Sequence, residues 1–320
     1  MNGLSKESAT LLEVGEESAG QRIDNFLLRV AKGVPKSHVY RILRSGEVRV
    51  NRGRVGADYR LNMGDMVRVP PIRTAERPAA AAVPARDFAV AYEDDALIVL
   101  DKPSGVAVHG GSGISFGVIE QLRRARPLAK FLELVHRLDR ETSGLLMVAK
   151  KRVALTKLQD LFRYGGISKR YLALVKGRWM NPTQHVRLSL HKYLTSDGER
   201  RVSVSPEGKD AHSIVRLVAR WQSYSLVEVE LKTGRTHQIR VHLSHLGFPL
   251  VGDDKYGDFA LNREVQKQGL KRMFLHAAKL NFSHPVSGEF IDLEAPLPSE
   301  LVSFVAMLDR QEKRDYGQAL

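Results

Sequence analysis

The stretch H-R-L-D-R-E-T-S-G at residues 136–144 is the most informative segment of this chain. It places the carboxylate of Asp139 between Arg137 and Arg140, directly before a turn of small residues. A carboxylate flanked by fixed positive charge stays ionised even when partly buried, because the neighbouring charge offsets the cost of desolvation. We therefore expect Asp139 to act as a nucleophile or a base. The alternative is an ordinary Arg–Asp surface pair in a loop.

Two segments flank this loop with polar residues that a core would not need. The segment D-K-P-S-G-V-A-V-H at 101–109 follows a buried strand and runs into a glycine-rich stretch. It lacks the spacing of a phosphate-binding loop, so a plain turn is the favoured interpretation. The segment S-K-R-Y-L-A-L-V at 168–175 predicts a strand in which Tyr171 could stack on a base or donate its hydroxyl. An ordinary strand tyrosine is the alternative.

A third segment, K-T-G-R-T-H-Q-I-R-V-H at 232–242, predicts a strand that turns into a helix ending at Gly247. Arg235 and Arg240 lie near the helix entry, where a phosphate or a carboxylate also meets free N–H groups. Arg240 could hold Asp139 in place and ionised. The alternative is that either arginine only binds phosphate.

The bulk composition favours a folded protein with a polyanionic partner. The chain has 320 residues, 43% of them hydrophobic, with 50 Lys and Arg against 36 Asp and Glu, a formal charge of +14. Such an excess indicates nucleic acid, with an acidic membrane surface as the competing partner. The absence of cysteine excludes disulfides and thiolate metal sites. No apolar run is long enough to span a membrane and the first twenty residues do not resemble a leader, so we expect a cytoplasmic protein.

Positive charge is concentrated in a small module expected at residues 20–70, after an N-terminal tail at 1–19. Residues 21–60 contain ten Lys or Arg and three acidic residues, which is half of the net charge. Apolar spacing predicts one helix from Ile23 to Val30 and a second around Val39 to Leu43, capped by Ser37 and ended by Gly46, before a small sheet. We expect a continuous phosphate-binding face, with a merely solvated face as the alternative. Its residues are Lys32, Lys36, Arg41, Arg44, Arg49, Arg52 and Arg54.

A linker is expected at residues 71–86, because four prolines and six alanines occur between Pro70 and Arg86. From residue 87 to 320 short strands alternate irregularly with helices. A buried strand is predicted at 96–100, a helix around Leu155 to Phe162 and an alternating strand at 227–231. Irregular order and alternation predict an α+β fold on a mixed, largely antiparallel sheet.

Taken together, these motifs resemble two known families. The helix–helix–strand order of residues 20–70, with G-V-P-K-S between the helices, is similar to the S4 RNA-binding domain. The ordered set D-K-P-S-G, H-R-L-D-R-E-T-S-G, K-R-Y-L-A-L-V, T-G-R-T-H-Q-I-R-V-H and F-L-H-A resembles the RluA family of RNA pseudouridine synthases over residues 90–295. With the S4-like module in front, the chain is most similar to the RluC-type enzymes that modify large-subunit ribosomal RNA.

The resemblance implies roles for individual residues. Asp139 matches the catalytic aspartate, Arg137 the arginine that takes the place of the extruded uridine, and Tyr171 the tyrosine that lies against uracil. Arg240 matches the arginine paired with the aspartate, and Leu275 an apolar wall of the base pocket. From their place in the fourth motif we add Arg235 and His237 as candidate substrate contacts.

The chemistry that this implies needs no redox change and no added group, so we expect neither a cofactor nor a metal. Uracil leaves C1′ and rejoins it through C5, while one carboxylate either attacks C1′ or removes the proton at C2′. The base must first be flipped out of stacked RNA. The expected partner is large-subunit ribosomal RNA (23S), free or partly assembled, with no membrane and no obligate protein partner.

Two rival functions are open at this point. One is a metal-dependent hydrolase, in which histidines would join Asp139 as ligands; no H-E-x-x-H sequence occurs. The candidate ligands are His136, His237, His242, His245 and His276. The other is a ribosome-assembly factor that binds RNA with little or no catalysis, for which damaged motif residues would be expected.

Overall fold

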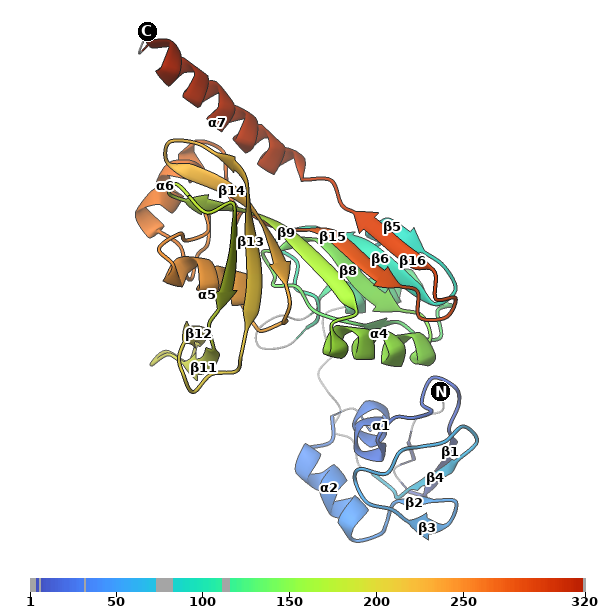
Figure 1. Ribbon diagram of the computed structural model, residues 1–320. Helices are drawn as coiled ribbons and strands as arrows, with labels where there is room; N and C mark the ends of the chain where they lie inside the picture. Colours follow the sequence, from blue (N-terminus) through green and yellow to red (C-terminus); the bar gives the residue numbers. More distant parts are fainter. Residues whose placement is uncertain (1–3, 6, 32, 73–82, 111–115, 319–320) are drawn as a thin grey trace. The chain divides into compact units, whose positions relative to one another are not determined.

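The computed structural model describes residues 4–318 except 6, 32, 73–82 and 111–115. The chain divides into two compact units (Figure 1). The first consists of Met1–Pro84 with Leu128–Phe131, and the second of Ala85–Pro127 with Leu132–Leu320. Most of the linker predicted at 71–86 falls outside the described residues. Within the described part, no helix is both long and apolar enough to cross a bilayer.

The first unit is a small sheet with two helices. The sheet is antiparallel, in the order β1-β4-β2-β3. Its first strand lies within the segment assigned above to an N-terminal tail, which carries no periodic pattern to predict a strand. The elements are β1 (Thr10–Glu13), α1 (Ile23–Val30), α2 (Lys36–Arg44), β2 (Arg49–Val50), β3 (Gly53–Arg54) and β4 (Met66–Val69).

The predicted helices of the first unit are confirmed, one cap excepted. Helix α1 buries the apolar stripe that begins with Ile23, and Gly46 follows α2 with a positive φ of 74°. The capping role predicted for Ser37 is wrong, because α2 begins at Lys36 and its N-cap is Pro35, with no side-chain cap hydrogen bond. Proline suits a helix start because its fixed φ is preorganised and it has no N–H to leave unpaired.

The second unit is built on one large sheet in the order β10-β13-β14-β9-β15-β8-β6-β5, with β16 pairing β15 and β7 pairing β8. Only β15 and β8 pair in parallel among the described strands, so the sheet is mixed and largely antiparallel, as predicted. A separate hairpin joins β11 to β12. The strands are β5 (Ala89–Glu93), β6 (Leu97–Lys102), β7 (Glu133–Leu134), β8 (Ser143–Ala149), β9 (Ile167–Lys176), β10 (Thr183–Arg187), β11 (Leu190–Leu194), β12 (Arg200–Val204), β13 (His212–Arg220), β14 (Tyr224–Leu231), β15 (Leu275–Ser283) and β16 (Phe290–Glu294).

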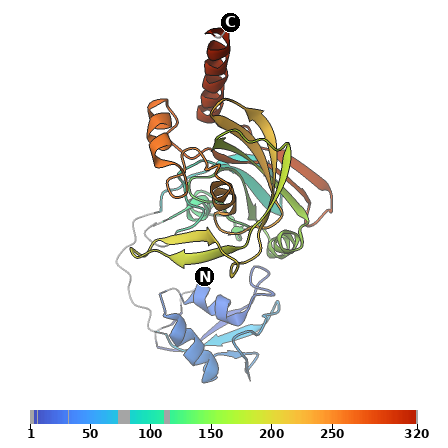
Figure 2. The same cartoon turned by 60° about the vertical axis from the view of Figure 1, so that its left-hand side comes forward.

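Helices of the second unit cover both faces of this sheet (Figure 2). Side chains alternate along β9, so Tyr171 and Ala173 join the core shared with α3 and α5, whereas Leu174 joins the core shared with α6 and α7. The candidate site thus belongs to the α5 face. The helices are α3 (Val118–Ala125), α4 (Arg152–Tyr164), α5 (Gln238–His245), α6 (Phe259–Lys267) and α7 (Ser299–Gln318).

The strand after the Asp139 loop passes unusually close to a neighbour. In the parallel pairing of β8 with β15, Gly144 lies opposite Ala277 and has a φ of +106°. A Cβ added at Gly144 would stand 2.3 Å from the carbonyl oxygen of Ala277. Only glycine fits this contact, which fixes where the Asp139 loop enters the sheet.

We predict that Gly144→Ala destabilises the protein by more than about 2 kcal/mol, because the backbone contact adds to the cost of a positive φ. Thermal unfolding of the purified protein would measure the change. Gly165→Ala is the matched control, since Gly165 has a φ of +81° but no atom within 4 Å of an added Cβ. Equal losses in the two variants would contradict the close-approach argument.

Candidate active site

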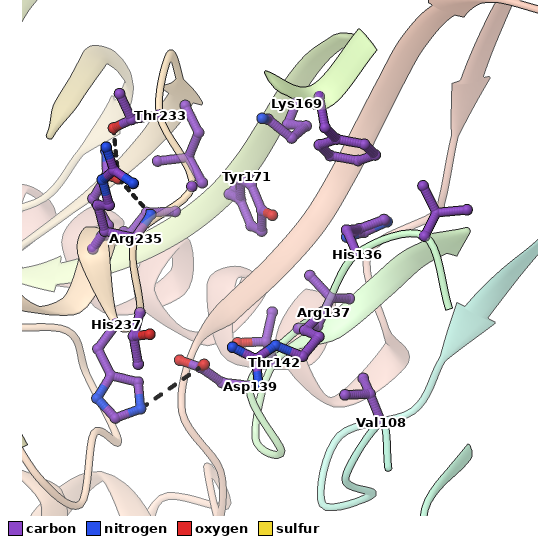
Figure 3. Close-up of a pocket in the computed structure, with 18 of the residues that line it drawn as sticks. Val108, His136, Arg137, Asp139, Thr142, Lys169, Tyr171, Thr233, Arg235 and His237 are labelled. Carbon is purple, nitrogen blue, oxygen red and sulfur yellow. Dashed lines mark hydrogen bonds and ion pairs between the residues drawn. The ribbon is translucent and has the colours of Figure 1, made fainter. Parts of the chain in front are cut away.

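A pocket of about 1020 Å³ opens on the α5 face of the sheet (Figure 3). Its walls come from the Asp139 loop, from β9 and from the turn between β14 and α5. Residues from distant stretches of the sequence therefore meet in one cavity. The predicted site residues that line it are Arg137, Asp139, Tyr171, Arg235, His237, Arg240 and Leu275.

Asp139 faces Arg240, as the sequence predicted. The Nη1 of Arg240 donates to Oδ2 of Asp139 at 3.4 Å, and the side chain of Asp139 is 28% exposed whereas that of Arg240 is 3% exposed. The carboxylate therefore meets both the pocket and a buried cation. The contact orients the carboxylate toward the pocket, where a base or nucleophile would act.

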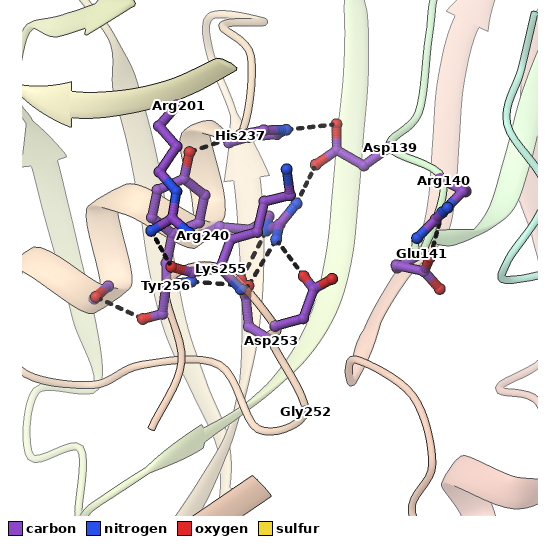
Figure 4. A network of polar contacts seen from close by, with 12 residues as sticks. Asp139, Arg140, Glu141, Arg201, His237, Arg240, Gly252, Asp253, Lys255 and Tyr256 are labelled. Carbon is purple, nitrogen blue, oxygen red and sulfur yellow. Dashed lines mark hydrogen bonds and ion pairs between the residues drawn. The ribbon is translucent and has the colours of Figure 1, made fainter. Parts of the chain in front are cut away.

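Arg240 is itself fixed from behind by Asp253, a fully buried residue (Figure 4). Nε and Nη2 of Arg240 donate to the two carboxylate oxygens of Asp253 at 2.7 and 2.6 Å. Burial works against the charge of Arg240, but the hydrogen bonds and charge of Asp253 raise its pKa overall. Burial likewise opposes the charge of Asp253, and Arg240 outweighs it, so the pKa of Asp253 is lowered. The pair is ionised and leaves Nη1 free to reach Asp139.

His237 approaches the other oxygen of Asp139 from an uncommon backbone conformation. It has a φ of +53°, and its Nε2 lies 3.9 Å from Oδ1 of Asp139. Its Nδ1 lies 2.8 Å from the hydroxyl of Tyr256, which accepts a hydrogen bond from the amide of Val202. The hydroxyl proton is thus available to Nδ1, which places the ring proton on Nε2, toward Asp139. Burial, opposed by Asp139, lowers the pKa of His237, so the neutral ring is favoured.

Tyr171 and Leu275 form the inner part of the pocket. They are 7% and 3% exposed, on the adjacent strands β9 and β15. Burial, with Asp139 nearby, raises the pKa of the Tyr171 phenol, so this hydroxyl keeps its proton at neutral pH. Arg137 and Arg235 are exposed at the pocket border, and Nε of Arg235 donates to the carbonyl of Asp210 at 3.0 Å.

The D-K-P-S-G segment braces the Asp139 loop. The buried ammonium of Lys102 donates to the carbonyl oxygens of Pro103, Val106 and Arg140 at 2.8, 2.8 and 3.1 Å. Ser104 Oγ donates to the carbonyl of Glu141 at 2.8 Å. The backbone on the C-terminal side of Asp139 is therefore held by side chains that lie well upstream in the sequence.

Of the histidines proposed for the metal-hydrolase alternative, His237 lies near Asp139, whereas His136, His242 and His276 make their contacts elsewhere. Among the described residues, no three His, Asp or Glu side chains lie close enough together to hold a metal ion. His242 and His276 are buried, and their Nδ1 atoms meet Ser213 at 3.1 Å and Ser143 at 2.9 Å. Nε2 of His136 accepts from the amide of Met147.

In the first unit, the predicted basic residues are exposed, and Lys32 lies outside the described residues. Asn51 and Arg52 form the two-residue turn of the β2–β3 hairpin with φ values of 48° and 70°. Arg41 pairs with Glu47 at 3.2 Å, so one member of the set is partly neutralised. The exposed residues are Lys36, Arg41, Arg44, Arg49, Arg52 and Arg54.

Sequence reasoning missed the residues behind the site. Asp253 and Tyr256 lie in the stretch G-D-D-K-Y-G at 252–257, which has no periodic pattern or known ligand spacing. Their importance comes from contacts with Arg240 and His237, earlier in the sequence. The one available signal was the cluster of charged residues between two glycines.

Comparison with known proteins agrees with this geometry. Residues 96–245 match the family model of RNA pseudouridylate synthase, and residues 21–67 match the S4 domain. The chain belongs to the RNA pseudouridylate synthase family and is an isomerase, because relatives of that family share about half of its residues over most of its length.

The chain is 52% identical to the ribosomal large subunit pseudouridine synthase C of Yersinia pestis, over 91% of this chain and 93% of the relative. It is 51% identical to the protein of the same name from Escherichia coli K12, over 92% and 95%. Among solved structures, human RNA pseudouridylate synthase domain containing 4 aligns with a TM-score of 0.58 and 26% identity, over 69% of this chain and 92% of that one. The predicted α+β fold is confirmed.

We predict that Asp253→Asn lowers stability at pH 7 by about 3–5 kcal/mol, the cost of leaving a buried charge unpaired. Because the pKa of Asp253 is lowered in the folded state, the stability it contributes is present above the unfolded carboxyl pKa of about 3.9 and is lost as pH falls below it. Denaturant unfolding from pH 7 to pH 3 should therefore show the gap between wild type and variant closing.

Asp254→Asn is the matched control, because Asp254 touches the same guanidinium at 3.3 Å but its side chain is 59% exposed. It should cost no more than about 1 kcal/mol. A gap between wild type and Asp253→Asn that is constant across this pH range would contradict the ion-pair assignment.

Proposed function

We propose that this chain isomerises one or more uridines of large-subunit ribosomal RNA to pseudouridine, with Asp139 as the catalytic carboxylate. The names of its close relatives support the substrate. The observation that carries the site assignment is the contact of Asp139 with Arg240 in one pocket beside Tyr171, with Asp253 fixing Arg240 from behind. We propose the cytoplasm as its location and free or partly assembled RNA as its substrate form, since extruded bases require incompletely packed RNA.

In this proposal the flipped uridine places its ribose at Asp139 and its base against Tyr171. Leu275 forms an apolar wall, and Arg137, exposed at the pocket border, fills the space that the base leaves in the RNA. Flipping costs a few kcal/mol, which stacking and the displacing side chain offset. Arg235 and His237 contact the nucleotide near its sugar.

Asp139 then either attacks C1′ or removes the proton at C2′. In both routes the bond from N1 to C1′ breaks and uracil leaves as a delocalised anion. The base turns and C5 bonds to C1′, while either the bond from Asp139 to C1′ breaks or the proton held by Asp139 returns to C2′, so the carboxylate is regenerated. The proton from C5 is then replaced by one at N1, and no cofactor or metal is required. Arg240 orients the carboxylate toward the pocket.

The first unit supplies the sequence-independent part of RNA binding in this proposal. Its exposed arginines and Lys36 carry charge that phosphates neutralise. The match to the S4 domain supports this assignment.

We predict that Asp139→Asn lowers tritium release from RNA labelled at uracil C5 by at least about 100-fold, because the neutral amide can neither attack nor take a proton. RNA binding, measured by filter retention, should stay close to that of wild type. An Asn variant with the wild-type rate would refute the site assignment. Wild type that binds the RNA but releases no tritium would favour the assembly-factor alternative.

We predict that the triple variant Lys36→Ala, Arg44→Ala and Arg52→Ala weakens RNA binding and reduces the slope of log K against log salt. The reduction should be about 0.7–0.9 for each phosphate that the protein no longer neutralises. Lys267→Ala, an exposed change on α6, serves as the control for loss of one positive charge. An unchanged slope in the triple variant would show that these side chains are only solvated.

A further inference from the structure

The pocket continues past Tyr171, away from Asp139. Lys169 lies beyond Tyr171 on the same strand, with an aromatic ring beside it (Figure 3). Residues two apart on a strand point to the same face and stand about 7 Å apart, so Lys169 and Tyr171 face the same cavity. Gln159, Phe162 and Lys232 complete this arm of the pocket.

Lys169 is a buried cation without an anionic partner. It is 8% exposed, and among the described residues its ammonium makes no hydrogen bond and no ion pair. The one attractive contact of its ammonium there is with the ring of Phe162, whose centroid lies 4.9 Å from Nζ. A buried ammonium is normally paired with an anion, because burial removes its hydration. The contact with the Phe162 ring offsets only part of that cost.

The groups around Lys169 leave its positive charge uncompensated. The ring of Phe162 packs against His136 at 4.8 Å between centroids. Burial, with Lys169 nearby, lowers the pKa of His136 to about 3, so this ring is neutral. Lys232 is a second cation and is already paired with Glu230 at 2.5 Å. Burial and Lys232 lower the pKa of Lys169. An incoming negative charge would be stabilised here.

We propose that Lys169 is a further catalytic residue, which donates a hydrogen bond to a carbonyl oxygen of the departing uracil and stabilises its anion. This inference deepens the proposed function and rests on it. O4 lies across the uracil ring from N1. A base whose ribose is at Asp139 and whose ring lies against Tyr171 therefore directs O4 along β9 toward Lys169.

The electron balance of the step gives Lys169 its role. When the bond from N1 to C1′ breaks, its electron pair goes to the uracil ring and spreads over O2 and O4. Asp139 loses its negative charge in the same step, either to the new bond with C1′ or to the C2′ proton. Negative charge thus moves from the carboxylate beside Arg240 to the base beside Lys169, which stays protonated throughout. A cation that meets charge formed only during reaction accelerates the step and does not tighten ground-state binding.

The test compares single-turnover rates on a ribosomal RNA fragment that wild type modifies, made with uridine or with 5-fluorouridine at the target position. Fluorine withdraws electrons and stabilises the uracil anion without help from the protein. Because C5 of 5-fluorouridine carries no proton, its rearranged product cannot complete the reaction, so the rate measured for this RNA is the loss of intact 5-fluorouridine. We expect Lys169→Met to slow conversion of uridine by about 100-fold, as for loss of one donor to a developing oxyanion. With 5-fluorouridine the loss should be markedly smaller. Liquid chromatography of the digested nucleosides measures both rates, because pseudouridine has the same mass as uridine but elutes separately, and loss of 5-fluorouridine is followed from its own peak.

Two variants serve as controls. Lys169→Arg keeps the charge and should retain most of the activity, and Lys267→Met removes an exposed charge outside the pocket and should leave both rates unchanged. The melting temperature of Lys169→Met should equal or exceed that of wild type, because an unpaired buried charge is removed.

An equal loss on the two RNAs, or no loss on either, would overturn the proposal. A weaker Kd with a shallower salt dependence and an unchanged rate would assign Lys169 to an RNA phosphate instead. Wild type unable to convert uridine in any ribosomal RNA would count against the proposed function itself, which keeps the two failures distinct.

Discussion

The buried ion pair between Arg240 and Asp253 is the interaction on which the candidate site depends. It lets a guanidinium stand almost fully enclosed behind the pocket, since two of its N–H groups are satisfied by one carboxylate. The remaining nitrogen then reaches Asp139 on a loop 101 residues earlier in the chain. Without Asp253, the guanidinium of Arg240 would keep only its contacts with Asp139 and the exposed Asp254, and it would no longer be fixed in the position from which it orients the reactive carboxylate.

Charge compensation differs between the two ends of the pocket. At the Asp139 end, cations and carboxylates are matched through Arg240, Asp253 and Asp254. At the far end, the ammonium of Lys169 has only the ring of Phe162 among the described residues. This difference in charge pairing means that a further negative charge is disfavoured near Asp139 and is stabilised near Lys169, where the uracil is proposed to lie. The proposed reaction moves charge in that direction, so the asymmetry serves the chemical step more than the binding of substrate.

Much of the fold and of the candidate site could be predicted from the sequence, because the signals lie in short stretches of neighbouring residues. The apolar stripe beginning at Ile23 specifies α1, and the motif strings specify which strands and loops carry polar groups. The contact of Arg240 with Asp139 was proposed because both ends lie in recognisable motifs. Asp253 was missed because its role exists only through a long-range contact. Ser37 was misjudged as a cap because a neighbouring proline began the helix first. The exposure of the basic residues in the first unit could be predicted from the sequence. Which of them contact RNA phosphates depends on the bound RNA and could not.

The ammonium of Lys102 is surrounded by three carbonyl oxygens, one for each of its protons. A tetrahedral donor suits that pyramid of acceptors, whereas a flat guanidinium carries its protons in one plane and needs more room. This position therefore discriminates between the two common basic residues by shape and not by charge. Replacement of Lys102 by arginine would keep the net charge of the chain but would lose the hydrogen bonds that hold the Asp139 loop.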